Sequence, residues 1–167
     1  MRRTRILGVG MYLPEREITN QDFEAMEALQ TSDEWIRQRT GILTRRFVSE
    51  GQSGTDLALQ ASKEAIENAK LSPDDIDFII FATLSPDYFF PGNGCFVQDR
   101  IFGDRTIGAL DVRTQCSGFI YSLSVADSLI KTGQYEHILI VGAEVQSTAL
   151  DFTFAGRDVT VLFDLQR

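Results

Sequence analysis

The sequence predicts an α/β fold, with a mostly parallel core sheet and helices on both of its faces. Segments of strand character and segments of helix character alternate along the 167 residues, and this alternation is typical of βαβ units. Three short runs, at 76–83, 107–112 and 137–141, are mostly apolar, as expected for strands that are covered on both faces. The length suits one compact domain.

Helix start and stop signals place the remaining elements. Thr19 and Asp22 have the spacing of a capping box before a short helical pattern. A stripe of alanines between Ala58 and Ala69 predicts one tightly packed face on the longest helix. Helices are expected at 19–28, 31–41, 54–69 and 95–102 and directly after Cys116, and further strands at 4–9 and from Asp158 or Val159 to Phe163.

The composition argues against several classes of function. Sixteen basic and twenty-four acidic residues give a net charge of -8, whereas general nucleic-acid binding requires a basic face. No apolar run is long enough to cross a bilayer. Two cysteines and one histidine, His137, are too few for a disulfide framework or a zinc site. We expect a cytoplasmic chain without nucleic acid, membrane or metal partners, and with His137 at a strand edge or the surface.

The most informative stretch, 107–126, combines a strand, a tight turn and a helix, with Cys116 at the turn. The free N–H groups and the positive dipole end at the start of a helix favour a thiolate over a thiol. Gly118 follows closely and allows another backbone or a ligand to approach. Such an elbow suits a nucleophile, but the local pattern equally fits a small buried hydrophobic residue.

A second stretch predicts a brief helix that carries the only tryptophan. Thr31 and Glu34 have capping-box spacing at its start, and Gly41 suits its end. Trp35 and Arg39 are four residues apart and therefore share one face of the helix. An indole beside a guanidinium can bind a base and its phosphates. The alternative is that Trp35 is a core anchor and Arg39 covers it.

The loop from Ser85 to Gly92 contains three adjacent aromatic residues and two prolines. A loop of this composition can form a lid, a pocket wall or a subunit contact, and it can equally be an ordinary packed loop. The helix expected after it includes Cys95 within its apolar pattern, so a structural role is expected for this cysteine.

A set of motifs occurs in order along the chain. They are Gly8-Val-Gly-Met-Tyr-Leu-Pro14, Thr31-Ser-Asp-Glu-Trp-Ile36, Arg39-Thr-Gly-Ile42, Phe90-Pro91, Asp111-Val112, Cys116-Ser-Gly-Phe119 and Ile140-Val-Gly-Ala-Glu144. With them the sequence, from Ile6 to about Phe163, resembles the N-terminal half of a ketoacyl-acyl-carrier-protein synthase III, a condensing enzyme of thiolase-like fold. The resemblance implies that 1–167 form a single N-terminal thiolase-like half-domain.

The resemblance implies an acyltransferase of fatty-acid or related ketide biosynthesis. Cys116 would take an acyl group from acyl-coenzyme A as a thioester, which is covalent catalysis by an activated thiolate. A malonyl group on an acyl-carrier protein would then lose carbon dioxide and attack this thioester. The Cys116 N–H would form part of an oxyanion hole. Coenzyme A enters as a substrate, so no permanently bound cofactor is expected.

The resemblance also implies which residues bind coenzyme A. Trp35 would stack on the adenine, Thr31 would support it, and Arg157 would cover its other face. Arg39 would contact the phosphates. Phe90 would close the acyl pocket of a neighbouring subunit, so a homodimer is expected.

The sequence departs from the family pattern at its end. Family members continue with a second, pseudo-symmetric half that supplies a histidine and an asparagine, whereas this sequence ends Asp164-Leu-Gln-Arg167. We therefore expect truncation near 164–167, with the C-terminal half absent and condensation weak or lost. The alternative is a non-catalytic truncated paralogue that binds coenzyme A or pairs with a full-length synthase, or the product of a degraded gene.

Overall fold

The computed structural model describes residues 2–150 of the chain. Its centre is a parallel sheet of three strands in the order β4-β3-β5. They are β3 (Phe78–Ala82), β4 (Gly108–Val112) and β5 (Ile138–Gly142). β3 lies between the other two, and its Ile79, Ile80 and Phe81 are fully buried. The α/β fold with a parallel core sheet is therefore confirmed, and the strand expected near 158–163 lies outside the described residues.

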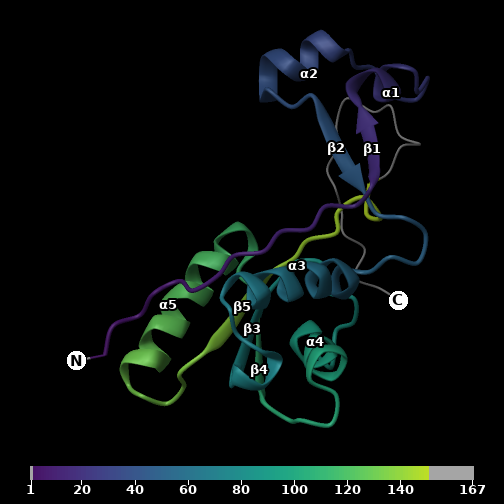
Figure 1. Cartoon of the computed structure of the whole chain (residues 1–167). Helices are drawn as coiled ribbons and strands as arrows, with labels where there is room; N and C mark the ends of the chain where they lie inside the picture. The colour runs from purple at the N-terminus through teal and green to yellow at the C-terminus, as the bar shows by residue number, and fades with distance from the viewer. Residues whose placement is uncertain (1, 151–167) are drawn as a thin grey trace.

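Helices cover both faces of this sheet, as predicted (Figure 1). α3 (Gly54–Asn68) and α4 (Asn93–Phe102) lie on one face, and α5 (Gly118–Lys131) lies on the other. Gly94 of α4 packs against Phe81, while Gly118 of α5 packs against Ala82. Side chains alternate across a strand, so these two neighbours in β3 point to opposite faces.

The main core lies between the sheet and the pair α3–α4. Its fully or nearly fully buried members come from the two helices and from β3 and β5, with Ile76 before β3: Ala58, Ile66, Ile76, Ile79, Phe81, Val97, Leu139 and Val141. Ser53 begins α3 with a capping box to Asp56, since each residue's side chain accepts a hydrogen bond from the other's backbone N–H. None of the helices within 2–150 is long and apolar enough to cross a membrane.

A second unit, which we call the hairpin lobe (residues 16–47), stands beside the sheet in Figure 1. β1 (Arg16–Thr19) pairs antiparallel with β2 (Thr44–Phe47), and two short helices connect them. They are α1 (Asn20–Glu24) and α2 (Asp33–Thr40). The capping box of Thr19 and Asp22 is confirmed, but the helix it begins ends well before residue 28. The strand pair itself was not predicted.

The strand expected at 4–9 is not formed, because no strand of the described part of the chain pairs with this segment. Instead the segment runs over α3. Gly8 and Gly10 lie so close to the backbone at Ala61 and Ala65 that neither could carry a Cβ atom. The predicted tight packing of the alanine stripe is therefore confirmed, and the N-terminal segment is what packs on it.

β4 also differs from the prediction. It was expected to be buried on both faces, but within residues 2–150 it pairs only with β3 and lies at the edge of the sheet. Gly108 and Leu110 are exposed, and because they alternate along the strand, one face of β4 is open to solvent. The Cys116 turn therefore follows an edge strand, which leaves it open to solvent on one side.

Candidate active site

Cys116 lies where the sequence places it, at the turn between β4 and α5. β4 ends at Val112, a single turn of 3₁₀-helix spans Gln115–Ser117, and α5 begins at Gly118. The Cys116 side chain is exposed. The alternative that this cysteine is a buried hydrophobic residue is therefore wrong.

The turn that carries Cys116 is fixed on both sides. The Ser117 hydroxyl donates to the Thr114 carbonyl over 2.7 Å, and the buried Gly118 packs with its Cα against Ala82 of β3. One turn further along α5, the fully buried Ser122 hydroxyl donates back to the Gly118 carbonyl. The Cys116 thiol is thus exposed, while hydrogen bonds and packing hold the turn that carries it in place.

The start of α5 is electrostatically suited to an anion. Ser117 precedes the helix, but its side chain makes no capping hydrogen bond to the first turn. The first N–H groups of a helix and its dipole stabilise negative charge. A thiolate, or an oxyanion that forms beside Cys116, would lie close to these groups.

His137 is not a partner of Cys116. It lies just before β5, at the opposite end of the parallel sheet from the loop after β4. Its ring Nδ1 is 3.0 Å from the Asp75 carbonyl, and its backbone N–H donates to the Asp77 carboxylate. The expectation of an edge position is confirmed. Within residues 2–150, no group of three histidine, cysteine or acidic residues could hold a metal ion.

The other cysteine differs from its prediction. Cys95 was expected to pack within the apolar pattern of α4, but its side chain is exposed. The buried face of α4 is formed by Asn93, Gly94 and Val97 instead. The helix therefore packs through two residues of its first turn and one central valine. The chain therefore presents two exposed thiols in its described part.

α2 presents the predicted pair of an indole and a guanidinium. Trp35 is 54% exposed, and the Arg39 guanidinium carbon lies 5.5 Å from the centre of the indole ring. The core-anchor alternative for Trp35 is wrong, since Ile36 is the residue of α2 that is buried. The part of that alternative in which Arg39 covers the ring is confirmed.

The start of α2 differs by one residue from the prediction. Ser32, not Thr31, caps the helix, and its hydroxyl accepts a hydrogen bond from the Trp35 N–H over 3.1 Å. Gly41 ends the helix in a left-handed conformation with φ of 72°, as expected. Thr31 is half-buried just before the cap.

The aromatic loop after β3 is strongly exposed. Tyr88, Phe89 and Phe90 are 62%, 74% and 86% exposed. This exposure argues against an ordinary packed loop. It leaves open whether the loop is a lid, a pocket wall or a subunit contact. The loop is anchored at its base, because the Asp87 carboxylate accepts hydrogen bonds from the Gly54 and Thr55 N–H groups at the start of α3.

Two residues next to the Cys116 turn hold this loop; Asp111 belongs to one of the motifs quoted above, whereas Arg113 was not singled out in the sequence. Arg113 donates to the Phe89 carbonyl over 3.0 Å. The Asp111 carboxylate accepts hydrogen bonds from the N–H groups of Asn93 and Gly94, where the loop enters α4. The cysteine turn and the aromatic loop are therefore connected through the end of β4.

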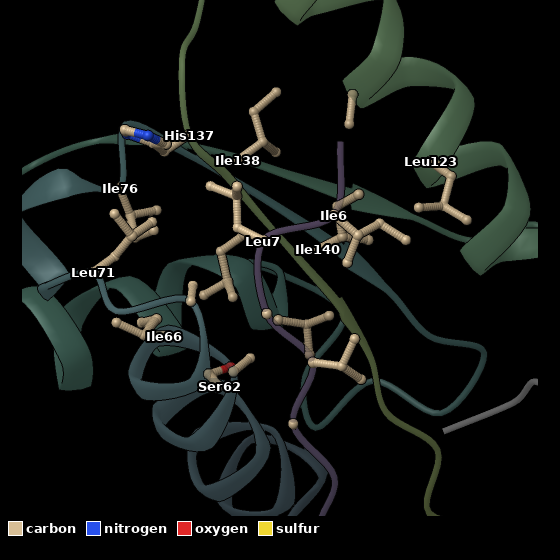
Figure 2. Close-up of a pocket in the computed structure, with 18 of the residues that line it drawn as sticks. Ile6, Leu7, Ser62, Ile66, Leu71, Ile76, Leu123, His137, Ile138 and Ile140 are labelled. Carbon is tan, nitrogen blue, oxygen red and sulfur yellow. The ribbon is translucent and has the colours of Figure 1, made fainter. Parts of the chain in front are cut away.

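An apolar cavity of about 500 Å³ lies elsewhere, between the N-terminal segment, α3, α5 and β5. Figure 2 shows Ile6 and Leu7 of the N-terminal segment, Leu123 of α5 and Ile138 and Ile140 of β5 among the residues that line it. None of the predicted site residues in the described part of the chain lines this cavity. The structure joins the Cys116 turn to the aromatic loop, whereas Trp35 and Arg39 lie separately on α2 of the hairpin lobe (Figure 1). Arg157 lies outside the described residues.

Comparison with known proteins agrees with this arrangement. The model of the family described as 3-oxoacyl-[acyl-carrier-protein (ACP)] synthase III matches residues 110–164. A curated relative from Fusobacterium nucleatum, beta-ketoacyl-[acyl-carrier-protein] synthase III, is 48% identical over 98% of this chain and 48% of its own length. Along nearly its whole length the chain is similar to 3-oxoacyl-[acyl-carrier-protein] synthase III. It spans about half the length of the curated relatives it matches.

Other members of the synthase III family give the same result. A relative of the same name from Caldanaerobacter subterraneus is 46% identical over 95% of this chain and 46% of its own length. The crystal structure of 3-oxoacyl-[acyl-carrier-protein] synthase III from Aquifex aeolicus superposes with a TM-score of 0.84, at 45% identity, over 95% of this chain and 50% of that one. The fold is therefore the thiolase-like α/β fold of this family.

Proposed function

We propose that this chain carries the acyl-accepting part of a 3-oxoacyl-[acyl-carrier-protein] synthase III of fatty-acid or related ketide biosynthesis. In this proposal the Cys116 thiolate attacks the carbonyl carbon of an acyl-coenzyme A. A new thioester forms on Cys116, and the bond to coenzyme A breaks, so that coenzyme A leaves as a thiolate and takes up a proton. Coenzyme A is thus a substrate, and the chain has no permanently bound cofactor.

The exposure of Cys116 directly before α5 is the observation that carries the proposal. An exposed thiol just before a helix is a suitable nucleophile, because the positive end of the helix dipole favours the negative charge that develops during attack. The similarity to synthase III sequences supports the same role.

We propose that the nucleotide part of coenzyme A binds to α2. Trp35 and Arg39 offer an exposed ring and a cation on one helix face, which suits the adenine and the phosphates of coenzyme A. We include Thr31 and Arg157 in the proposed adenine site from the family resemblance. Phe90, as the most exposed aromatic residue of the loop, is proposed to close the acyl pocket of the second subunit of a homodimer.

For the whole protein we propose the second half-reaction as well. A malonyl group on an acyl-carrier protein loses carbon dioxide, and the resulting carbanion attacks the Cys116 thioester. This forms the new carbon–carbon bond and releases the Cys116 thiolate. The acyl-carrier protein is thus a proposed partner in this second half-reaction.

The acylation step is tested by intact-protein mass spectrometry after incubation with an acyl-coenzyme A. We expect the mass to increase by one acyl group in the wild type, and no increase in Cys116→Ala. Because Cys95 is also exposed, Cys95→Ser is the matched control and should retain the full increase.

An increase that persists in Cys116→Ala and disappears in Cys95→Ser would contradict the assignment of the nucleophile. A wild type that binds coenzyme A but is never acylated would favour the alternative of a non-catalytic paralogue that binds coenzyme A. Binding is followed in the same samples by the fluorescence of Trp35, the only tryptophan of the chain.

A further inference from the structure

α2 carries the proposed nucleotide platform but has little apolar packing of its own. Of its eight residues, only Ile36 is buried. A helix of two turns is not stable in isolation, and one buried side chain leaves its orientation weakly determined. Polar contacts must therefore fix the position of Trp35 and Arg39.

Asn20, the first residue of α1, makes these contacts. Its side chain is fully buried. The Nδ2 group donates to Asp33 Oδ1 over 2.8 Å and to the Ile42 carbonyl over 2.8 Å. Asp33 begins α2, and Ile42 follows its C-cap, so one amide holds both ends of the helix.

The third contact of this side chain joins the hairpin. Asn20 Oδ1 accepts a hydrogen bond from Arg45 Nη1 of β2 over 2.6 Å. The orientation of the amide is determined by its partners, because the Asp33 carboxylate and the Ile42 carbonyl only accept and a guanidinium only donates. The arrangement is therefore specific for an asparagine, and an aspartate of the same shape would place acceptors against acceptors.

We propose that Asn20 is the positioning residue of the coenzyme A platform. It holds the two ends of α2 against β2 and thereby fixes where Trp35 and Arg39 meet the nucleotide. This inference rests on the proposed function for its ligand, but the positioning of α2 is measurable without it.

The decisive variant is Asn20→Asp, which keeps the shape and the contact with Arg45 and replaces two attractive contacts by repulsive ones. The matched control is Ser53→Ala. This variant removes the capping hydrogen bond of α3, which lies outside the hairpin lobe, and should cost about as much free energy as Asn20→Asp. The double variant Asn20→Asp with Asp33→Asn restores one donor–acceptor pair and should recover part of any loss.

The first readout is the fluorescence of Trp35, which reports on α2 alone because no other tryptophan is present. We expect lower anisotropy and stronger acrylamide quenching in Asn20→Asp, and wild-type values in Ser53→Ala. The dissociation constant of coenzyme A should rise roughly tenfold to a hundredfold in Asn20→Asp, as expected when two hydrogen bonds that include a charged group are lost.

The second readout separates positioning from general damage. Cys116 acylation by a subsaturating acyl-coenzyme A should slow by the same factor in Asn20→Asp. Acylation by the corresponding N-acetylcysteamine thioester, which lacks the nucleotide, should stay within about twofold of wild type, because it makes no use of α2.

Equal slowing with both thioesters, or an unchanged Trp35 signal with unchanged coenzyme A affinity, would overturn the proposal. A wild type that fails to bind coenzyme A would instead disprove the proposed function. In that case the anisotropy and quenching of Trp35 still decide whether Asn20 holds α2.

Discussion

The sheet and the hairpin lobe are held together in different ways. In the sheet, three consecutive residues of β3, Ile79 to Phe81, are fully buried, and helices cover both faces. In the hairpin lobe, the fully buried side chain is the amide of Asn20, and the arginines pack on aromatic rings, such as Arg45 over Phe23 at 4.5 Å. Apolar burial dominates the sheet, whereas the hairpin lobe combines a few buried apolar side chains, Ile18, Ile36 and Phe47, with oriented polar contacts.

The difference teaches how the two regions should respond to change. Apolar burial is not directional, so its loss costs free energy in proportion to the buried area. A buried hydrogen-bond network is directional, and one wrong partner leaves several groups unsatisfied. The first region should therefore control global stability, and the second should control local geometry.

The largest effect is expected in the sheet. Phe81→Ala removes a fully buried ring at the centre of the core and should lower the free energy of unfolding by about 3–5 kcal/mol. Urea unfolding followed by circular dichroism measures it. Phe89→Ala, at a ring that is 74% exposed, should change this free energy by no more than about 0.5 kcal/mol. Similar losses in both variants would contradict the assignment of the core.

An intermediate effect, confined to the hairpin lobe, is expected for Arg45→Ala. This change removes the 2.6 Å hydrogen bond to Asn20 and the contact with the Phe23 ring, and should cost about 1–3 kcal/mol locally. Hydrogen exchange of the α2 amides should accelerate while that of β3 stays unchanged. Arg37→Ala breaks only an exposed pair with Asp33 and should cost at most about 0.5 kcal/mol. Uniform acceleration in both regions would show that they unfold together.

The smallest effect concerns acid. The Thr19 N–H, with help from its hydroxyl, holds the pKa of Asp22 below its usual range. A group with a lowered folded pKa contributes stability above its unfolded pKa, and this is lost as the pH falls through the folded value, here below about pH 4. Asp22→Asn should therefore weaken the hairpin lobe near neutral pH. The difference from wild type should vanish in strong acid.

The Trp35 fluorescence during an acid titration measures this difference. The same titration applies to α3, because the Ser53 N–H lowers the pKa of Asp56, and amide exchange of α3 reports it separately. If the Asp22→Asn variant remained weaker than wild type at the lowest pH, the carboxylate would not be the cause.

The sheet could be predicted from the sequence because its signals are local. Apolar runs mark β3 and β5, and the alanine stripe marks α3. The hairpin was missed because β1 and β2 are charged, as in Thr44–Phe47 with its two arginines, and lack the alternation that indicates a strand. The choice of Ser32 over Thr31 as cap depends on geometry that two adjacent hydroxyl residues do not reveal.

The candidate site was predicted in the same uneven way. The strand–turn–helix pattern located Cys116, since the pattern itself is local. Its exposure, and that of Cys95, depends on how segments distant in the sequence pack against each other, which no local pattern shows. Asn20 was hidden inside a capping motif, and the contacts of Asp111 and Arg113 join segments about twenty residues apart.

The three parallel strands have their carboxyl ends at the same end of the sheet. β3 leads into the aromatic loop, β4 leads into the Cys116 turn, and β5 leads to Glu144, whose carboxylate accepts hydrogen bonds from the Leu84 and Ser85 N–H groups. Loops accept substitutions and insertions more readily than paired strands do. Substitutions in these three loops therefore alter the surroundings of the Cys116 thiol. The strand register, which fixes the position of the Cys116 turn, stays the same.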